Sequence, residues 1–359
     1  MARSSGITLR AVALTLETRH PFRIARGGSG EFQTVLIALG WRGMTGYGEA
    51  ASSTYVGENT GTVWAALRIY AQVLKASGAT PFATARLLDD CHARLRHNPA
   101  ARAAVDMALH DLLGKALDAP LTDLWGLRGL PLPPTSLTIA IDAPEVMVTK
   151  VREAAGWSAL KIKVGFPGDV EVVQEIRRLT DQTLHVDANE GWTVREAVAR
   201  GRQLAALGVD MIEQPVPAAD LEGLRFVRDH VGIPVFADEA CVTSADLPRL
   251  AGVVDGINIK LAKCGGLREM RRMIDTARAL QLRVMFGCMV ETSVGVTAAA
   301  QLGSQADVLD LDGSSLLARD PMRGMTVECG VITLSDAPGL GVGPRDRAVG
   351  KALREAKPL

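Results

Sequence analysis

Three acidic side chains recur along the chain at nearly equal intervals, each at the end of an apolar run. They are Asp187 in LHVDAN, Glu213 in MIEQP and Asp238 in VFADE, separated by 26 and then by 25 positions. Apolar runs rich in β-branched residues are typical of buried parallel strands, and a repeat of this length matches one strand and one helix. The spacing therefore predicts successive strands of a (β/α) barrel, with the three acids converging at its C-terminal mouth.

These acids also predict a metal site. Carboxylate oxygens are hard ligands, and no cluster of His or Cys residues accompanies them in the sequence. Such a donor set favours Mg²⁺ over Zn²⁺, and we expect one ion per subunit. Each acid taken alone could instead cap a helix after its strand, but their common phase favours a shared site.

Composition narrows the class of protein. The 359 residues are 47% hydrophobic, which is enough for a large core and more than one domain. Basic and acidic residues number 40 each and form no block, so we expect neither nucleic acid nor a membrane as a partner. Five cysteines without a CxxC pair indicate reduced thiols, and no segment reads as a leader or membrane span. We expect a cytoplasmic protein that forms a homo-oligomer.

The periodicity of the chain changes twice. Strand-like alternation gives way to helical stripes, and then the Gly- and Pro-rich segment GLRGLPLPPTS precedes eight strand candidates separated by helical stretches. We therefore expect an α/β protein built on a modified TIM barrel, (β/α)7β. The predicted units are an α+β capping domain over 1–128 with mobile lid loops near 20–30 and 51–61, the catalytic barrel over 129–325, and a segment over 326–359 that returns to the capping domain.

Lysines occupy the walls beside the predicted metal site. Lys161 and Lys163 are two positions apart on the second barrel strand, so both side chains face the interior. Lys260 ends the sixth strand, on the opposite wall. Two lysines in an otherwise apolar strand are hard to solvate, which favours a function over a surface charge. Lys263 follows three residues later in a predicted loop, and we interpret it as a bystander.

A metal flanked by two ammonium groups suits the removal of a proton α to a carboxylate. The ion would stabilise the enediolate that forms, and a lysine becomes a base when nearby positive charge and desolvation lower its pKa. Lys161 and the metal would do this for Lys163. One base on each face of a planar intermediate allows a 1,1-proton transfer that inverts the stereocentre.

The strings KxK, DxN, ExP, DE and KxxKxGG occur in this order and resemble the enolase superfamily, muconate-lactonizing subgroup, over nearly the whole chain. The resemblance implies that Asp187, Glu213 and Asp238 bind Mg²⁺ and that Lys163 and Lys260 are the acid/base catalysts. The mandelate-racemase subgroup uses a His-Asp pair instead. It is excluded because all six histidines lie at or before position 230, ahead of the last three strands.

The eighth strand carries a second acidic pair. Asp310 and Asp312 share a face and point inward, where two carboxylates are costly unless they meet a cation. Helix capping, or an ion pair with Arg319 or Arg323, is the alternative. With the string GCMVE after strand seven, this DxD pair resembles the dipeptide epimerases, in which it binds the substrate ammonium. By the same resemblance the substrate site also includes Lys161, Thr138, Cys288, Met289 and Glu291.

The sequence does not determine which side chains the dipeptide carries. Epimerases that act on Ala-Glu dipeptides carry an arginine in the first lid loop, where Gly27 aligns in this chain and Arg26 lies beside it. The second lid loop offers Tyr55 and Glu58, and Glu58 would favour a cationic side chain. The chain is therefore identified as similar to L-Ala-D/L-Glu epimerases, with an acidic, a cationic or a hydrophobic side chain as alternatives.

Two other functions compete with this one. An N-acylamino-acid racemase/o-succinylbenzoate synthase or a muconate-type cycloisomerase would use the same lysines, but its substrate has no free ammonium for the DxD pair. A non-catalytic barrel would exchange no α-proton of any substrate with solvent.

Overall fold

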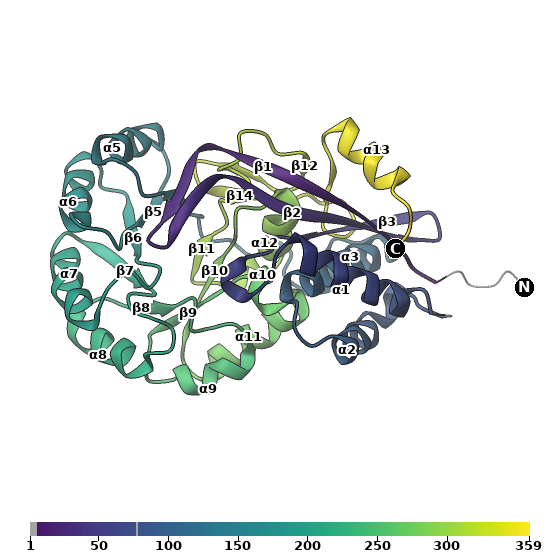
Figure 1. The fold of residues 1–359 in the computed structure, drawn as a ribbon, viewed down its shortest axis with the longest axis horizontal. Coiled ribbons are helices and arrows are strands. Elements are labelled where there is room, and N and C mark those ends of the chain that lie inside the picture. The colour runs from purple at the N-terminus through teal and green to yellow at the C-terminus, as the bar shows by residue number, and fades with distance from the viewer. Residues whose placement is uncertain (1–5, 77) are drawn as a thin grey trace, which may run out of the picture.

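The computed structural model describes residues 6–76 and 78–359. It consists of a three-stranded antiparallel sheet with its own helices, an eight-stranded parallel barrel and a short C-terminal region (Figure 1). None of the helices among these described residues is long and apolar enough to cross a membrane. The predicted combination of a barrel with an N-terminal α+β unit is confirmed.

The N-terminal sheet is a meander of β1 (Thr8–Ile24), β2 (Gly27–Trp41) and β3 (Met44–Ala50). Strands β1 and β2 pair along their length, and the register shifts between Glu17 and Phe22 before pairing resumes at the hairpin tip. Figure 1 shows this long hairpin reaching from the N-terminal sheet across the barrel. The first lid loop predicted from the sequence is therefore the end of a β-ribbon.

The N-terminal unit also contains helices, the longer of which pack against this sheet or against one another. They are η1 (Thr54–Val56), α1 (Thr60–Leu74), η2 (Pro81–Ala83), α2 (Thr84–Arg94), α3 (Pro99–Ala116) and α4 (Leu121–Leu124). Helix α3 lies so close to β3 that a Cβ atom on Gly46 or Gly48 would come within 2.2 or 2.0 Å of a helix carbonyl oxygen. Only glycine permits this approach, which buries the alanine-rich face of α3.

All eight predicted barrel strands are present, and hydrogen bonds join them in sequence order. They are β4 (Leu137–Ile139), β5 (Ala159–Lys163), β6 (Thr183–Asp187), β7 (Val209–Glu213), β8 (Val235–Ala237), β9 (Gly256–Ile259), β10 (Arg283–Gly287) and β11 (Val308–Asp310). The barrel closes through a parallel bridge between Thr135 and Leu309, where the Ser136 N–H donates to the Leu309 carbonyl over 3.0 Å. The strand ends therefore form one continuous mouth.

The outer layer of the barrel is helical. It contains α5 (Pro144–Glu153), α6 (Asp169–Leu179), α7 (Val194–Ala206), α8 (Leu221–Val231), η3 (Ser244–Asp246), α9 (Leu247–Leu250), α10 (Leu261–Cys264), α11 (Leu267–Ala279), α12 (Ser293–Ala300) and η4 (Gly303–Gln305). One large apolar core lies between these helices and the strands, as expected for runs buried on both faces.

The chain ends beside its own first strand. Two short strand pairs, β12 (Met322–Arg323) with β15 (Gly343–Pro344) and β13 (Thr326–Glu328) with β14 (Val331–Thr333), lead to α13 (Arg347–Glu355). After α13, the Leu359 N–H donates to the Leu9 carbonyl over 2.9 Å. We keep 1–128, 129–325 and 326–359 as a proposed division into units.

Two acids of the N-terminal unit bind the first turns of barrel helices. Asp106 on α3 accepts hydrogen bonds from the backbone N–H groups of Leu267 (2.9 Å) and Arg268 (3.2 Å) at the start of α11. Glu49 on β3 accepts from the N–H (3.0 Å) and the hydroxyl (2.5 Å) of Thr292, directly before α12. The first N–H groups of a helix have no partner within it, so these acids fix how the two units dock.

We predict that Glu49→Ala destabilises the whole chain. Its loss leaves buried donors at the start of α12 without acceptors, which costs about 1–3 kcal/mol. Urea unfolding followed by circular dichroism measures the change. Glu31→Ala, which removes an exposed acid from β2, is the control. Equal unfolding midpoints for the two variants would contradict the docking role of Glu49.

Candidate active site

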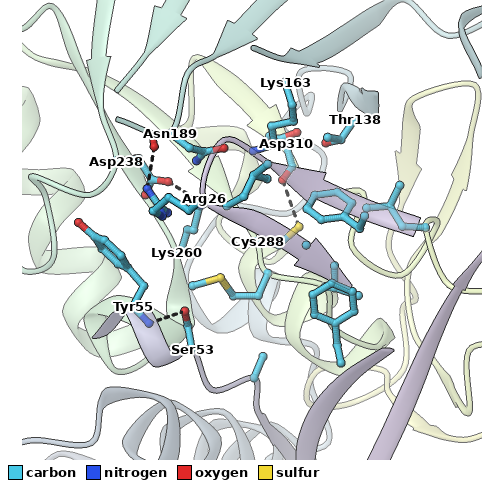
Figure 2. A pocket seen from close by; sticks show the side chains of 18 of the residues that line it. Arg26, Ser53, Tyr55, Thr138, Lys163, Asn189, Asp238, Lys260, Cys288 and Asp310 are labelled. Atoms are coloured by element: carbon cyan, nitrogen blue, oxygen red, sulfur yellow. Dashed lines mark hydrogen bonds and ion pairs between the residues drawn. The ribbon is translucent and has the colours of Figure 1, made fainter. Parts of the chain in front are cut away.

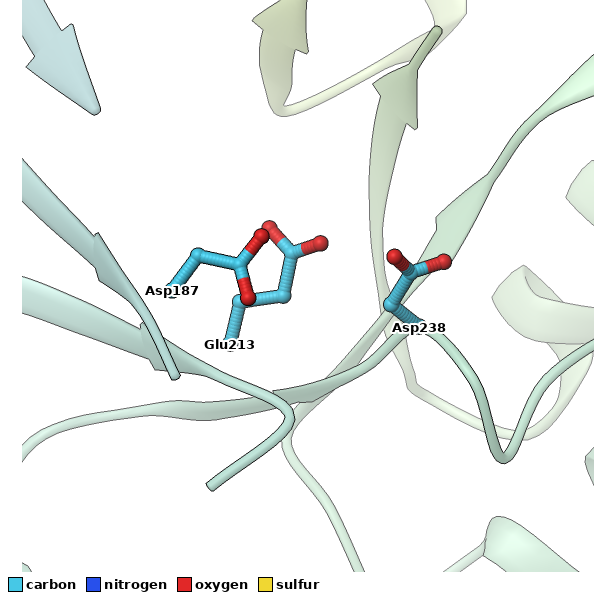
Figure 3. Close-up of side chains that lie close together, drawn as sticks. All are labelled: Asp187, Glu213 and Asp238. Atoms are coloured by element: carbon cyan, nitrogen blue, oxygen red, sulfur yellow. The ribbon is translucent and has the colours of Figure 1, made fainter. Parts of the chain in front are cut away.

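The three acids with equal spacing meet at the mouth of the barrel. Asp187 ends β6, Glu213 ends the neighbouring β7, and Asp238 follows β8 directly. One oxygen from each carboxylate lies within 4.8 Å of the others, and all three side chains are buried. Figure 3 shows the carboxylates turned toward one another. The convergence expected from the sequence is therefore found.

The loops after these strands are tied down by local hydrogen bonds. The Asn189 N–H donates to Asp187 Oδ1 over 2.9 Å. The Gln214 side-chain oxygen accepts from the N–H groups of Asp238 (3.0 Å) and Ala240 (3.1 Å). Asn189 and Gln214 have φ angles of +41° and +35°, in the left-handed region that residues other than glycine seldom adopt. This backbone geometry turns the carboxylates inward.

The donor set fits a divalent cation. One Glu213 oxygen accepts from the Asn258 amide over 2.8 Å. The other lies 2.7 Å from Lys161 Nζ but receives no hydrogen bond of good geometry, although it is fully buried. Three hard carboxylates, one of them oriented by an amide and left with a free lone pair, are what Mg²⁺ coordination requires.

Lys161 and Lys163 both point into this cluster from β5. Lys161 Nζ is 3.1 Å from Asp187, 2.7 Å from Glu213 and 2.8 Å from Asp310. Lys163 Nζ is 2.6 Å from Asp187. The two-residue spacing therefore places both ammonium groups inside the barrel, as predicted from strand geometry.

Lys260 approaches from the other wall. It follows β9, and its Nζ is 2.7 Å from Asp238 Oδ2. Lys263 was interpreted from the sequence as a bystander in a loop, which is wrong. The short helix α10 carries it back to the mouth, where its buried ammonium binds the Asp238 carboxylate and the Cys241 carbonyl. One helical turn separates positions 260 and 263, so both side chains reach the same acid.

The charges of the cluster are unevenly compensated. Burial alone would lower the pKa of Lys161 and of Lys260, but the neighbouring carboxylates outweigh burial and raise both. Glu213 behaves differently: burial, followed by the nearby Asp187 carboxylate, raises its pKa to about 8. Burial and the neighbouring carboxylate therefore oppose a full negative charge on Glu213, and a divalent cation held by these acids would offset both effects.

Asp310 already has a cation within the chain. It ends β11, and its carboxylate accepts from Lys161 (2.8 Å) and from the Ser136 hydroxyl (2.8 Å). The sequence argument treated both acids of the DxD pair as lacking a partner, which is wrong for Asp310. Its partner could not be inferred because Lys161 is 149 positions away.

Asp312 is bound only by neutral groups. Its carboxylate accepts from the Thr138 N–H over 2.6 Å, and no lysine or arginine in the described ranges lies within ion-pair distance of it. Arg319 pairs with Asp346 instead, so the alternative of an ion pair with that arginine is not observed. Burial, together with the adjacent Asp310, raises the pKa of Asp312 to about 7. Asp312 is therefore the carboxyl group best placed to receive an external cation.

A cavity of about 240 Å³ connects these groups. Figure 2 shows Lys163, Lys260, Cys288 and Asp310 around it, with Arg26 and Tyr55 at the lid. The hairpin and the loops after β10 and β11 add apolar walls, formed by Phe22, Ile24, Phe32, Met289, Val290 and Leu316. Burial raises the pKa of the Cys288 thiol well above its usual value, consistent with a wall residue and not a nucleophile.

Two predicted substrate residues do not line this cavity. Glu58 turns away from it, and its Oε2 accepts from the Ala100 N–H over 2.8 Å at the start of α3. Glu291 is buried beyond the wall, where a Cβ atom on Gly295 would meet its carboxylate at 2.2 Å. Both predictions of a substrate contact are therefore corrected. Glu58 binds the N-terminus of α3, and Glu291 packs against α12.

Sequence reasoning missed how the lid binds the barrel. Arg26, at the hairpin tip, donates to the carboxylates of Glu239 (2.7 Å) and Glu190 (3.0 Å) and to the Asn189 carbonyl (2.9 Å). Its guanidinium lies 4.4 Å from the centre of the Tyr55 ring. The DxN and DE strings contain Asn189 and Glu239, but no local signal connects them to an arginine that lies 163 and 213 positions away, respectively.

Models of known protein families cover most of the chain. Residues 7–126 match the N-terminal domain of mandelate racemase/muconate lactonizing enzymes. Residues 146–348 match the enolase C-terminal domain-like family.

Individual proteins are similar over nearly the full length. The chain is 41% identical to an L-Ala-D/L-Glu epimerase of Bacteroides thetaiotaomicron, covering 91% of this chain and 85% of that protein. It is 39% identical to an L-Ala-D/L-amino acid epimerase of a Maribacter species, covering 91% and 96%. A dipeptide epimerase from Enterococcus faecalis, solved with Mg and the dipeptide L-Leu-L-Tyr, superposes with a TM-score of 0.89 at 33% identity, covering 94% and 99%.

We predict that Mg²⁺ stabilises the folded chain and that Glu213→Gln removes this effect. An ion that binds only the folded state adds about 2.7 kcal/mol at 100 times its dissociation constant. Thermal unfolding with Mg²⁺ and with EDTA measures the gain. Asp210→Asn, an exposed position on the same strand, is the matched control and should keep it. Equal gains for both variants would place the ion elsewhere.

Proposed function

The chain belongs to the mandelate racemase/muconate lactonizing enzyme family of the enolase superfamily, and from this premise we propose that it is a Mg²⁺-dependent dipeptide epimerase. It would invert the α-carbon of the C-terminal residue. The observation that carries this proposal is Asp312, a buried carboxyl group that faces the cavity without a cationic partner among the described residues. A substrate ammonium is the cation that suits it.

The substrate would span the cavity from the three acids to the DxD pair. Asp187, Glu213 and Asp238 would hold Mg²⁺, whose positive charge would stabilise a substrate carboxylate and the enediolate formed from it. Lys161, which contacts both Glu213 and Asp310, lies between the two ends. The ammonium of the first residue then meets Asp312.

Lys163 and Lys260 would be the two groups that transfer the proton. Three strands, β6 to β8, separate their walls, so their ammonium groups face the cavity from opposite sides. The amine of one lysine would take the α-proton, and the ammonium of the other would return a proton to the opposite face. The stereocentre is inverted and no atom is gained or lost. The carboxylates around Lys260 favour its ammonium form. A cation bound by those carboxylates would offset their charge and favour the neutral amine that a base requires.

The related reactions fit this geometry less well. An N-acylamino acid or a muconate carries no ammonium and would leave the buried Asp312 carboxyl without a cation. The relative solved with L-Leu-L-Tyr also supports a dipeptide as the substrate class. Cytoplasmic location and a homo-oligomeric state stay predictions.

Incubation of L,L-dipeptides in D₂O with Mg²⁺ tests the proposal. We expect one deuterium at the α-carbon of the C-terminal residue, read by mass spectrometry. Lys163→Ala and Lys260→Ala should each abolish epimerisation, while one of them still exchanges the proton of a single epimer because its remaining base acts from its own face. Lys351→Ala, at an exposed position on α13, is the control. No deuterium across the panel would overturn the proposal.

The role of Asp312 predicts a distinctive pH dependence. Because the pKa of its carboxyl is raised to about 7, this group is protonated in the free enzyme below that pH and cannot bind an ammonium. We expect kcat/KM to fall with pH below about 7, by about tenfold per pH unit, because one proton is bound. The acidic limb of the pH profile, meaning this fall below pH 7, should be weaker for kcat than for kcat/KM. In the complex the bound ammonium keeps the Asp312 carboxylate ionised. Asp312→Asn should remove the limb and raise KM at every pH. A constant kcat/KM through pH 7 would contradict this role.

A further inference from the structure

The hairpin tip is fastened to the barrel by a cluster of charges at Arg26. Its guanidinium donates hydrogen bonds to the Glu190 carboxylate, the Glu239 carboxylate and the Asn189 carbonyl. The Arg26 side chain is 34% exposed. One positive group thus faces two acidic groups. An acidic substrate side chain that approached Arg26 would also approach both carboxylates, so the cluster repels it instead of attracting it.

Both lid loops converge on one barrel residue. Glu190 accepts from Arg26 of the first loop and, over 3.2 Å, from the Tyr55 hydroxyl of the second. It also accepts from the Ala218 N–H over 2.7 Å, which fixes the carboxylate in the barrel. The backbone of Glu190 has a φ of +67°, a conformation with a cost for any residue but glycine. Through these three hydrogen bonds the Glu190 carboxylate holds the tips of both lid loops against the barrel.

The remaining cavity offers an acidic side chain no better partner. Among the described residues that line it, each lysine has a carboxylate within ion-pair distance. The lid side of the cavity is apolar instead, with Phe22 and Phe32 packed edge to face at 6.1 Å between ring centres. Ile24 and Leu316 continue this surface. Burial of apolar surface therefore favours an apolar side chain here.

We infer that Arg26 is an interdomain clasp and not a ligand of an acidic side chain, and that the enzyme selects dipeptides whose side chains are apolar. This inference rests on the proposed epimerase function and adds its substrate class. Arg26 is then a positioning residue: it holds the β1–β2 tip over the mouth through Glu190 and Glu239.

Epimerisation of matched dipeptides tests the substrate class. With L-Ala-L-Leu, L-Ala-L-Glu and L-Ala-L-Lys, we expect kcat/KM to be higher for the leucine dipeptide by about tenfold or more. The acidic cluster repels the glutamate side chain, and both charged side chains lose the apolar burial at the lid. A preference for the glutamate or lysine dipeptide overturns the inference and leaves the epimerase function intact. No exchange with any of the three, or with other L,L-dipeptides, overturns both.

Arg26→Met separates a clasp from a substrate ligand. A clasp serves every dipeptide, so kcat/KM should fall for L-Ala-L-Leu, whose side chain has no charge to bind Arg26, with faster hydrogen exchange at the hairpin tip. An unchanged kcat/KM for L-Ala-L-Leu together with a loss on L-Ala-L-Glu overturns the inference. Arg26→Met combined with Glu190→Gln should cost less than the sum of the two single changes, because the two residues share one contact. Arg26→Lys serves as a second test if Arg26→Met folds poorly. It keeps the charge but not the planar fork, so its activity should be only part of that of the unchanged enzyme.

Discussion

The balance of buried charge at the barrel mouth is the constraint on which the rest depends. Three carboxylates lie within 4.8 Å of one another, and their lysine partners come from β5 and from the segment after β9. Each buried charge costs several kcal/mol unless it is paired, and removal of one partner costs about 3–5 kcal/mol. These groups are correctly paired only when the barrel has closed with every strand in register. A site needed for chemistry therefore also makes the folded arrangement specific.

Polar groups perform a second task where the two units meet. Asp106 and Glu49 accept from the first N–H groups of α11 and α12, while Arg26 binds barrel loops at the hairpin tip. Such contacts are directional, unlike apolar burial, so they fix an orientation. The contacts at α11 and α12 hold the N-terminal unit against the barrel. The long β1–β2 ribbon extends from this unit to the lid, so the position of the unit determines where the hairpin tip lies (Figure 1). The shape of the cavity mouth thus depends on residues far from the chemistry.

Sequence periodicity could predict the barrel and its inward-facing groups, because strand spacing alone determines where Asp187 or Lys161 points. It could not predict pairings set by tertiary contact. Glu58 looked like a lid residue since its loop is rich in Gly and Ser, yet the start of α3 offers its carboxylate a stronger site in the backbone N–H of Ala100. Lys263 looked like a loop charge because α10 has only four residues, too few for a periodic signal. In each case the deciding partner lies far away in the sequence.

The substrate class depends on one such distant pairing. The proposed acid/base groups come from the barrel, and relatives that are similar over most of the chain are named for different substrates. The side chain of the proposed substrate would meet the lid, where Arg26 would look from its sequence position like a partner for glutamate. Its two carboxylate partners reverse that expectation, since a guanidinium bound to Glu239 and Glu190 presents little net positive charge. Whether an arginine attracts a substrate therefore depends on what already binds it, and that information lies in the fold.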